Sequence, residues 1–434
     1  MINETLGILY SALLSDQKSL EVRNRNVANS DNPDYVKERP VLQNLSYPGG
    51  VVVADVDRLS DEILQKQLLT STSLLKGYEE KKNVYDVIQN YFDDTTDSGL
   101  GKYIDNFFNS VLQFLRDPQN EGAKEAFLGN AQNLIDALKN RYNQLTEIQS
   151  QTKKKLALDI AQVNKISKEL AQVNKNIALL YAKGKSDSND YKYLLDERDK
   201  LLKQLSEYVN IDYNFDNLGR AEVRIFENDS TAAGYITLVF QNGDFNKLTY
   251  DGTTNKVVNS DGIEWPISFF KNGEIGAYTT IINDINSIKD GLNNLAQTLV
   301  NNTTITLNGS ATPVFKGTSV NDLTLNITKS DLDNYDLSSS ETDQDTIQQA
   351  WDTVRNTYNT FISEISNKYT DYQIKYETEL NLNQSLETKY SAEVGVNLDQ
   401  ELAEIMKLQQ HYQAISKMIA TSTRLVDYIL NAVQ

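Results

Sequence analysis

The stretch that decides the fold is residues 156–181, LALDIAQVNKISKELAQVNKNIALLY. Apolar side chains recur in it every three or four residues, at Leu156, Ile160, Val163, Ile166, Leu170, Val173, Ile177 and Leu180 or Tyr181. Lys, Asn and Gln fill the positions between them, so the apolar groups share one face of a helix. The stretch therefore predicts a long amphipathic rod whose apolar face needs a cover.

That cover is expected directly downstream. The polar residues 183–188, KGKSDS, break the pattern, and a second apolar run follows at Leu194, Leu195, Leu201, Leu202, Leu205 and Val209. A short break between two amphipathic helices favours an antiparallel hairpin. We expect the second run to fold back onto the first.

Residues 212–278 read as β structure. They show alternation such as 222–226, EVRIF, and the turn pairs Asn242-Gly243, Asp251-Gly252, Asp261-Gly262 and Asn272-Gly273, which predict hairpins. A helix is expected over 277–300, short strands over 304–307 and 323–327, and helix again from Asp343 to the end.

Both chain ends carry apolar stripes at helical spacing. The first has Leu6, Leu9, Tyr10, Leu13, Leu14 and Leu20, and the second has Leu398, Leu402, Ile405, Tyr412, Ile415, Ile419, Val426, Ile429 and Val433. Residues 29–34, NSDNPD, end the first helix, because Asn and Asp compete for backbone hydrogen bonds and Pro33 blocks continuation. After Pro48-Gly49-Gly50, residues 51–56 read as a strand. We expect the terminal helices to lie side by side.

The predicted fold class is multidomain α plus β: elongated, with paired, coiled-coil-like terminal helices, a long helical domain and an inserted β-rich domain. We predict a terminal helical assembly domain from residues 1–50 with 390–434. A helical rod-like domain comprises 51–210 with 341–389, and a β-rich outer domain with one helix comprises 211–340. In the free monomer the terminal helices are expected to be poorly ordered, because two amphipathic helices alone bury little surface.

Composition excludes several function classes. The chain has 60 acidic and 42 basic residues, a net charge of −18, which repels nucleic acid and anionic membranes. It has no cysteine and one histidine, His411, which we interpret as a surface or packing group. No run approaches the roughly 18 apolar residues of a membrane span, and residues 1–7, MINETLG, lack the features of a cleaved secretory signal.

No catalytic, cofactor-binding or metal-binding residues are predicted. Asp196 and Asp199 share a helical face as an acid–base pair might, but Arg198 and Lys200 favour a solvent-exposed helix with local ion pairs. Residues 93–99, DDTTDSG, are faintly like a calcium loop, yet the glycine falls one position late and no Glu closes it.

The end of the first helix carries a family resemblance. Residues 26–35, NVANSDNPDY, resemble the N-I-A-N-x-x-T-P-G-Y motif of flagellar rod, hook and hook-associated proteins, through Asn26, Ala28, Asn29, Pro33 and Tyr35. Asn32 and Asp34 replace the motif's Thr and Gly, which favours a type I over a type II turn. Residues 398–405, LDQELAEI, and 409–419, QQHYQAISKMI, resemble the C-terminal motif of the same axial protein family.

The interior indicates which branch of that family is meant. Residues 193–202, YLLDERDKLL, resemble the D-L-L-D-x-R-D-x-L-L segment of the hook-associated protein 1 branch, through Leu194, Leu195, Asp196, Arg198 and Asp199. Residues 115–120, LRDPQN, and 272–277, NGEIGA, are similar to two further landmarks of that branch. Because this chain is shorter than members with two variable outer domains, one β insert is expected.

The resemblance implies a structural subunit, not an enzyme, that connects the flagellar hook to the filament and is required for filament assembly. It implies these partners: further copies in a ring or helical layer, hook subunits, the adjacent second hook-associated protein, and an export chaperone on the C-terminal helix. The implied location is the extracellular flagellum, reached through the flagellar secretion system without a cleaved signal peptide. The expected assembly interface is Leu6, Leu9, Leu13, Leu20, Leu402, Ile405, Tyr412 and Ile419.

Two alternatives remain open from the sequence. One is another axial protein such as the hook subunit, although the long helical hairpin before the β insert is too large for it. The other is an exported adhesin or glycan-active enzyme with a flagellar-type export region, although the β insert shows no catalytic pairs.

Overall fold

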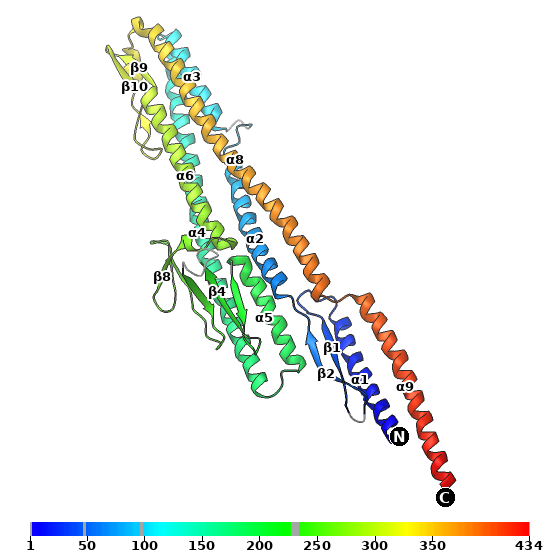
Figure 1. The fold of residues 1–434 in the computed structure, drawn as a ribbon. Coiled ribbons are helices and arrows are strands. Elements are labelled where there is room, and N and C mark those ends of the chain that lie inside the picture. Colours follow the sequence, from blue (N-terminus) through cyan, green and yellow to red (C-terminus); the bar gives the residue numbers. More distant parts are fainter. Residues whose placement is uncertain (1, 47–48, 96–98, 227–233, 434) are drawn as a thin grey trace.

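The fold is that of a computed structural model, which describes residues 2–46, 49–95, 99–226 and 234–433. It is an elongated α plus β molecule in which both chain ends lie together at one end (Figure 1). Long helices run the length of the molecule, and the strands form small sheets along its side. The predicted fold class is confirmed.

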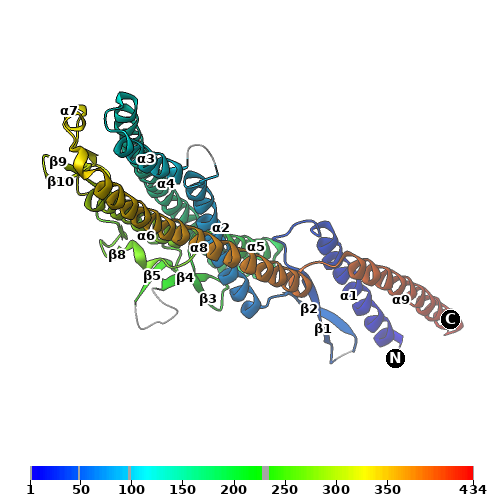
Figure 2. The ribbon, with the colours of Figure 1, turned by 90° about the horizontal axis from the view of Figure 1, so that it is seen from above.

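Four elements make up the end that holds both termini. They are α1 (Ile2–Ala28), β1 (Glu38–Asn44), β2 (Val51–Arg58) and α9 (Leu398–Val433). Strands β1 and β2 pair antiparallel, from Glu38 opposite Arg58 to Asn44 opposite Val51. Helix α1 packs against this hairpin and against α9, as Figures 1 and 2 show from two sides. We call these four elements the terminal unit.

A glycine permits the close approach of α1 to β2. Gly50 has a φ of +115°, and a Cβ there would lie 2.1 Å from the Ser11 hydroxyl oxygen. In the next turn of α1, the Ser15 hydroxyl donates to the Val51 carbonyl over 2.9 Å. The predicted strand over 51–56 is confirmed, while Pro48 of the turn before it lies outside the described residues.

The body of the molecule contains the remaining helices. They are α2 (Glu62–Tyr91), α3 (Leu100–Arg116), α4 (Glu121–Ala182), α5 (Asn189–Tyr208), α6 (Gly273–Asn302), α7 (Lys329–Asp333) and α8 (Ser340–Val394). Short 3-10 turns lie at Ile267–Phe269 (η2) and Leu337–Ser339 (η3).

Helices α4 and α5 form the predicted antiparallel hairpin. Gly184, with a φ of +66°, follows the end of α4, and the Ser188 hydroxyl caps α5 by accepting from the Tyr191 N–H. The predicted rod is longer than residues 156–181, because α4 begins at Glu121, where the Asn120 side chain accepts from the Ala123 N–H. An N-cap of this kind satisfies a backbone donor that the helix leaves open.

The strands of the body form small antiparallel sheets. The first holds β3 (Asp212–Phe215), β4 (Ala221–Phe226) and β5 (Tyr235–Val239), and the second holds β6 (Thr249–Asp251), β7 (Lys256–Val258) and β8 (Glu264–Pro266). β9 (Thr304–Leu307) pairs with β10 (Ser310–Pro313), and β11 (Phe315–Lys316) with β12 (Thr324–Leu325).

Three of the four predicted turn pairs lie between or beside strands. The prediction of a hairpin at the fourth pair is wrong. Asn272-Gly273 begins α6 instead of closing a hairpin. At Gly273, with a φ of +72°, a Cβ would lie 2.3 Å from the Tyr208 backbone, so the glycine lets the start of α6 meet the end of α5. An Asn-Gly pair supplies positive φ wherever it is needed, and its surroundings decide which element follows.

Two asparagines of α4 bind the sheets to the helix. The Asn174 side chain donates to the Ala221 carbonyl over 2.7 Å and accepts from the Ala221 N–H over 2.9 Å. Asn164 makes the same pair of bonds with Leu248, both over 2.7 Å. Each side-chain amide therefore bonds both the N–H and the C=O of one backbone residue, as a neighbouring β-strand would.

Continuous helix from Asp343 to the end is a second correction. The chain is helical from Ser340, but α8 ends at Val394 and α9 starts at Leu398. Gly395 caps α8, and the Asn397 side chain caps α9 by accepting from the Gln400 N–H. The two long C-terminal helices are thus separate elements.

One cluster of buried apolar side chains fills the body from Leu69 to Tyr372 and includes helices and strands alike. None of the described side chains of α1, β1, β2 or α9 belongs to it. The three-domain division stays a prediction. What the structure provides is a body with a continuous core and a terminal unit outside that core.

Candidate assembly interface

The eight predicted interface residues all lie on α1 and α9, which pack side by side. Leu9 is buried, and Leu402 and Tyr412 are exposed. Leu6, Leu13, Leu20, Ile405 and Ile419 are half-buried. The two stripes therefore cover each other only in part.

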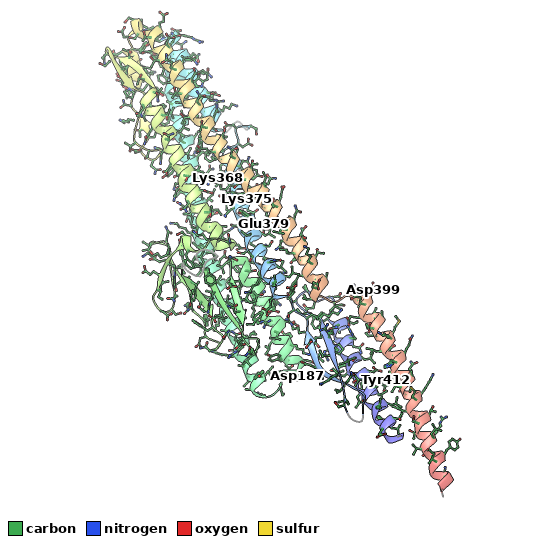
Figure 3. The ribbon with its side chains drawn as sticks, viewed as in Figure 1. Asp187, Lys368, Lys375, Glu379, Asp399 and Tyr412 are labelled. Carbon is green, nitrogen blue, oxygen red and sulfur yellow. The ribbon has the colours of Figure 1, made fainter. Side chains whose placement is uncertain are left out.

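A groove of about 450 Å³ runs between α1 and α9, and Leu20 and Tyr412 line it from opposite sides. Figure 3 labels Tyr412 about midway along α9. Nearer the N-terminus, the His411 Nδ1 lies 2.8 Å from the Asp16 carboxylate, so the single histidine joins the two helices. This position fits its interpretation as a packing group.

Further apolar side chains of the terminal unit are exposed and were not predicted as interface residues. They are Ile8, Tyr10 and Leu14 on α1, Leu42 and Val52 on the hairpin, and Leu398, Met406, Met418, Leu425, Tyr428 and Ile429 on α9. Leu14 is 63% exposed and Tyr428 is 73% exposed. Exposed apolar groups gathered over one unit mark a surface that can associate. Tyr10, Leu14, Leu398 and Ile429 stood in the predicted stripes, whereas the other exposed side chains did not.

Asn26 of the family motif is a fully buried hub. Its side-chain amide donates to the Glu38 carbonyl over 2.9 Å and to the Glu401 carboxylate over 3.0 Å. Its oxygen accepts from the Tyr35 hydroxyl and from the Glu38 N–H, over 2.9 and 3.0 Å. Asn26 thereby joins α1, β1 and α9.

Glu401 is the residue that sequence reasoning missed in this cluster. Its carboxylate is fully buried and receives Arg23 at 2.9 Å and Lys37 at 3.0 Å besides Asn26. Burial alone would raise the pKa of Glu401, but the hydrogen bonds from Asn26, Lys37 and Arg23 outweigh it and lower the pKa below its ordinary value. Its place in the 398–405 motif was the only sequence signal. We call Asn26, Glu401, Arg23 and Lys37 the clasp.

The other residues of the first motif shape the turn after α1. The Asn29 side chain donates to the Arg25 carbonyl over 2.9 Å, and the exposed Ala28 is the last residue of α1. The Tyr35 N–H donates to the Asn32 carbonyl across Pro33 and Asp34. Asp34 is not among the residues with positive φ, so the turn is not type II, as expected from the missing glycine.

The interior motif contradicts its sequence interpretation. Asp196 and Asp199 do not face solvent, because Arg58 at the end of β2 binds both, over 2.7 Å from Nε to Asp196 and 2.7 Å from an Nη to Asp199. All three side chains are largely buried, with 9%, 14% and 11% of Arg58, Asp196 and Asp199 exposed. Arg58 is separated from them by about 140 residues of sequence, so no local pattern could reveal the pairing.

The two carboxyls differ in their ionisation. Burial raises the pKa of Asp196 to about 6, against the opposing effect of Arg58. Burial acts on Asp199 in the same direction, but Arg198 and Arg58 outweigh it and lower the pKa. The Arg198 guanidinium also donates to the Gly219 carbonyl and lies 3.6 Å from the centre of the Phe215 ring. Leu194 and Leu195 pack against the main core.

Within the described residues, no group of three or more His, Asp or Glu side chains is arranged to hold a metal ion. Residues 96–98 of the calcium-like stretch lie outside them. No described helix combines the length and apolarity that a bilayer crossing requires.

Two models of known protein families match this sequence. The family model for the flagellar hook-associated protein FlgK helical domain matches residues 85–308, more than half of the 434 residues. The chain belongs to this FlgK family. A second family model, for the C-terminal part of the flagellar basal body rod FlgEFG proteins, matches residues 388–432, which include α9 and the clasp residue Glu401. The resemblance found in the sequence is confirmed.

The relatives of this FlgK-family chain that are described next are both named flagellar hook-associated protein 1. Flagellar hook-associated protein 1 of Bacillus subtilis is 25% identical over 223 residues, 48% of this chain and 43% of that protein. The Escherichia coli protein of that name is 21% identical over 312 residues, 68% of this chain and 55% of its own. The chain thus spans about half the length of the curated relatives it matches.

Among solved structures, the flagellar hook junction protein FlgK from Burkholderia pseudomallei superposes on 58% of this chain and 46% of its own. The TM-score is 0.48 and the sequence identity is 18%.

Proposed function

We propose that this chain is a structural subunit of the bacterial flagellum that joins the hook to the filament and is required for filament assembly. The observation that carries the proposal is the match of residues 85–308 to the FlgK helical-domain family. The relatives named hook-associated protein 1 support it. The role is structural and not enzymatic.

The terminal unit supplies the assembly surface in this proposal. Its exposed apolar side chains lose contact with water when another subunit packs on them, and each large one contributes about 1.5–3 kcal/mol. Leu14, Met406, Met418, Leu425 and Tyr428 are each more than half exposed, so each has apolar surface left to bury. Together with the half-buried stripe of α1 and α9, they form the interface we assign.

The partners follow from that position. We assign further copies of the chain in a ring or helical layer, hook subunits on one side and the second hook-associated protein on the other. An export chaperone on α9 would cover the same apolar groups before assembly. The hook–filament junction lies outside the cell, so the proposal requires export, for which we assign the flagellar secretion system without a cleaved signal peptide.

Deletion of the gene tests the function. Cells should keep hooks but release filament protein into the medium, and the unaltered chain supplied from a plasmid should restore filaments. Normal filaments in a clean deletion strain would rule the function out.

Substitution tests the assigned surface. Leu425→Asp should prevent filament restoration, because it places a charge in the apolar contact, whereas Lys417→Asp, an exposed polar position of the same helix, should restore filaments. If both variants restore filaments equally, the assembly surface is not on this part of α9.

A further inference from the structure

The terminal unit and the body share very little packed surface. The elements α1, β1, β2 and α9 pack extensively on one another, but none of them packs extensively on α2–α8. As far as the side chains are described, the main apolar core contains none from the terminal unit. Two units without a large apolar interface are expected to move relative to each other unless something else holds them.

The covalent links alone leave such a motion open. The chain passes between the terminal unit and the body twice, through residues 59–61 and 395–397. The links lie close together, because the Lys37 N–H donates to the Val394 carbonyl over 2.8 Å and the Leu59 N–H to the Lys37 carbonyl over 3.0 Å. Two short links define an axis, and the covalent structure alone would allow the terminal unit to rotate about it.

Apolar packing at the joint is incomplete. A cavity of about 260 Å³ lies between the loop after α1 and helices α2, α5 and α8. Val36, Leu68 and Val394 line it, together with the charged Asp199 and Lys203. Protein interiors are close-packed, so a pocket between these segments leaves fewer contacts to set the orientation.

Ion pairs to helix α5 supply the contacts between the terminal unit and the body that apolar packing does not. Lys192, Asp196, Asp199 and Lys200 follow one another along α5 at intervals that bring them to the same side of the helix. Lys192 lies 3.6 Å from Glu38, and Lys200 lies 3.4 Å from Asp34. Asp196 and Asp199 hold Arg58, each over 2.7 Å. Strands β1 and β2 of the terminal unit and the loop between α1 and β1 are therefore all tied to α5. Figure 3 labels Asp187, just before the start of α5.

Burial and short distances together make Arg58 the decisive contact. The Lys200–Asp34 pair is solvated and contributes little. The Lys192–Glu38 pair is buried, but its charged atoms lie 3.6 Å apart, against 2.7 Å for each of the two bonds of Arg58. The Arg58 side chain is 9% exposed, and its two carboxylate partners fix its planar guanidinium from two directions. Leaving a buried charge without its partner is costly, so this cluster tolerates one arrangement far better than any other.

We propose that Arg58, by binding Asp196 and Asp199 together, fixes a single orientation of the terminal unit on the body. Arg58 is a positioning residue: it does not lie on the exposed apolar faces, but it determines where they point. The consequence for assembly rests on the proposed function, whereas the orientation itself does not.

Distance measurements on the full-length free chain test this proposal. The chain has no cysteine, so Gln43→Cys on β1 and Asn83→Cys on α2, both exposed, accept a spin-label pair for pulsed electron resonance. The parent pair should give one narrow distance distribution. Arg58→Gln should make it about twofold wider, as for a released hinge. Adding Asp196→Asn to Arg58→Gln should change little more, because residues that act as a pair are not additive.

The matched control is Arg220→Gln. It removes the ion pair between Arg220 and Asp216, which lies entirely within the body, and should leave the distance distribution narrow. Should Arg58→Gln reduce the far-ultraviolet circular dichroism, Arg58→Lys replaces it, with an intermediate width expected. An unchanged distribution in folded Arg58→Gln or Arg58→Lys, or a broad one in the parent, would overturn the inference. Hooks and filaments are absent from this experiment, so its failure leaves the proposed function to the deletion test.

Discussion

Glu401 carries a buried negative charge between α9 and α1, and three donors from the terminal unit surround it. Removing one partner of a buried charge pair costs about 3 kcal/mol or more, because the remaining charges stay buried without compensation. We expect Glu401→Gln to open the clasp locally. Amide exchange at residues 22–28 should accelerate about a hundredfold.

The neighbouring Glu404 provides the control for this change. It is paired with Lys407 at 3.8 Å on the outside of the same helix, and Glu404→Gln should leave exchange at residues 22–28 unaltered. Equal exchange in the two variants would mean that the clasp does not hold the terminal unit. Because the pKa of Glu401 is lowered by folding, its stabilising contribution is present above about pH 4.5 and is lost as the pH falls through the folded pKa.

Glu274 at the start of α6 predicts the opposite pH dependence. Burial, and then the Asp159 carboxyl on α4, raises the pKa of Glu274 to about 8. The folded state therefore binds a proton that the unfolded state releases near pH 4.5, so the free energy of unfolding should fall as the pH rises from about 5 through 8. Glu274→Gln should remove this slope and stabilise the protein at pH 9 by about 1 kcal/mol, allowing for partial exposure.

Urea unfolding at several pH values measures that slope. Asp290→Asn, at an exposed position of the same helix, should leave it in place. A slope that persists in Glu274→Gln would assign the pH dependence to other groups.

At the residue scale the sequence supplied the motifs but not their contacts. Asn26 and Glu401 each stood in a motif, yet they are 375 positions apart and their bond is a property of the fold. Asp196 and Asp199 were misread because helical charge patterns usually face solvent. Arg58, which binds both carboxylates, stands in no motif and no apolar pattern of the sequence.

At the scale of elements, α4 depends on two asparagines to hold the β segments. Asn174→Ala leaves the N–H and C=O of Ala221 buried without partners, which should lower the free energy of unfolding by about 1–3 kcal/mol. Gln172→Ala, two positions away on the exposed side, should change it by less than about 0.5 kcal/mol. Denaturant unfolding followed by circular dichroism compares them, and equal stabilities would show that the amide bonds are dispensable.

The terminal helices are expected to be the least protected long elements of the free monomer. Ordering costs about 1–2 kcal/mol per residue, and the exposed stripe of α9 returns little of it until another subunit packs there. Hydrogen exchange should be fastest beyond the clasp, near residues 2–15 and 418–433, and slowest in the α4–α5 hairpin. Protection of both ends equal to that of the hairpin, in a dilute monomer, would make the stripes ordinary core.

Periodicity predicted the elements that pack along their full length. The hairpin of α4 and α5 and the terminal helices follow from apolar spacing, and the strand predicted at 51–56 follows from its β-branched run. Boundaries set by single caps did not follow, as at Asn120, Asn272 and Gly395. The position of a helix end depends on one hydrogen bond or one φ angle. A periodic pattern averaged over many residues does not specify either.

At the scale of the whole molecule, the chain leaves the terminal unit, builds the body and returns to the same end (Figure 1). The sequence predicted this path from the paired terminal stripes and the β segment between them. It did not predict that the body would have one continuous core with the terminal unit outside it, because core continuity depends on contacts between distant segments.

The most direct test of the central claim is electron microscopy of the purified chain bound to isolated hooks. We expect a discrete layer at the hook end, with the terminal unit inside the contact and the body outside it, and no layer with Leu425→Asp. If the unaltered chain is absent from hook ends, or if its layer attaches through the body, the terminal unit is not the assembly surface.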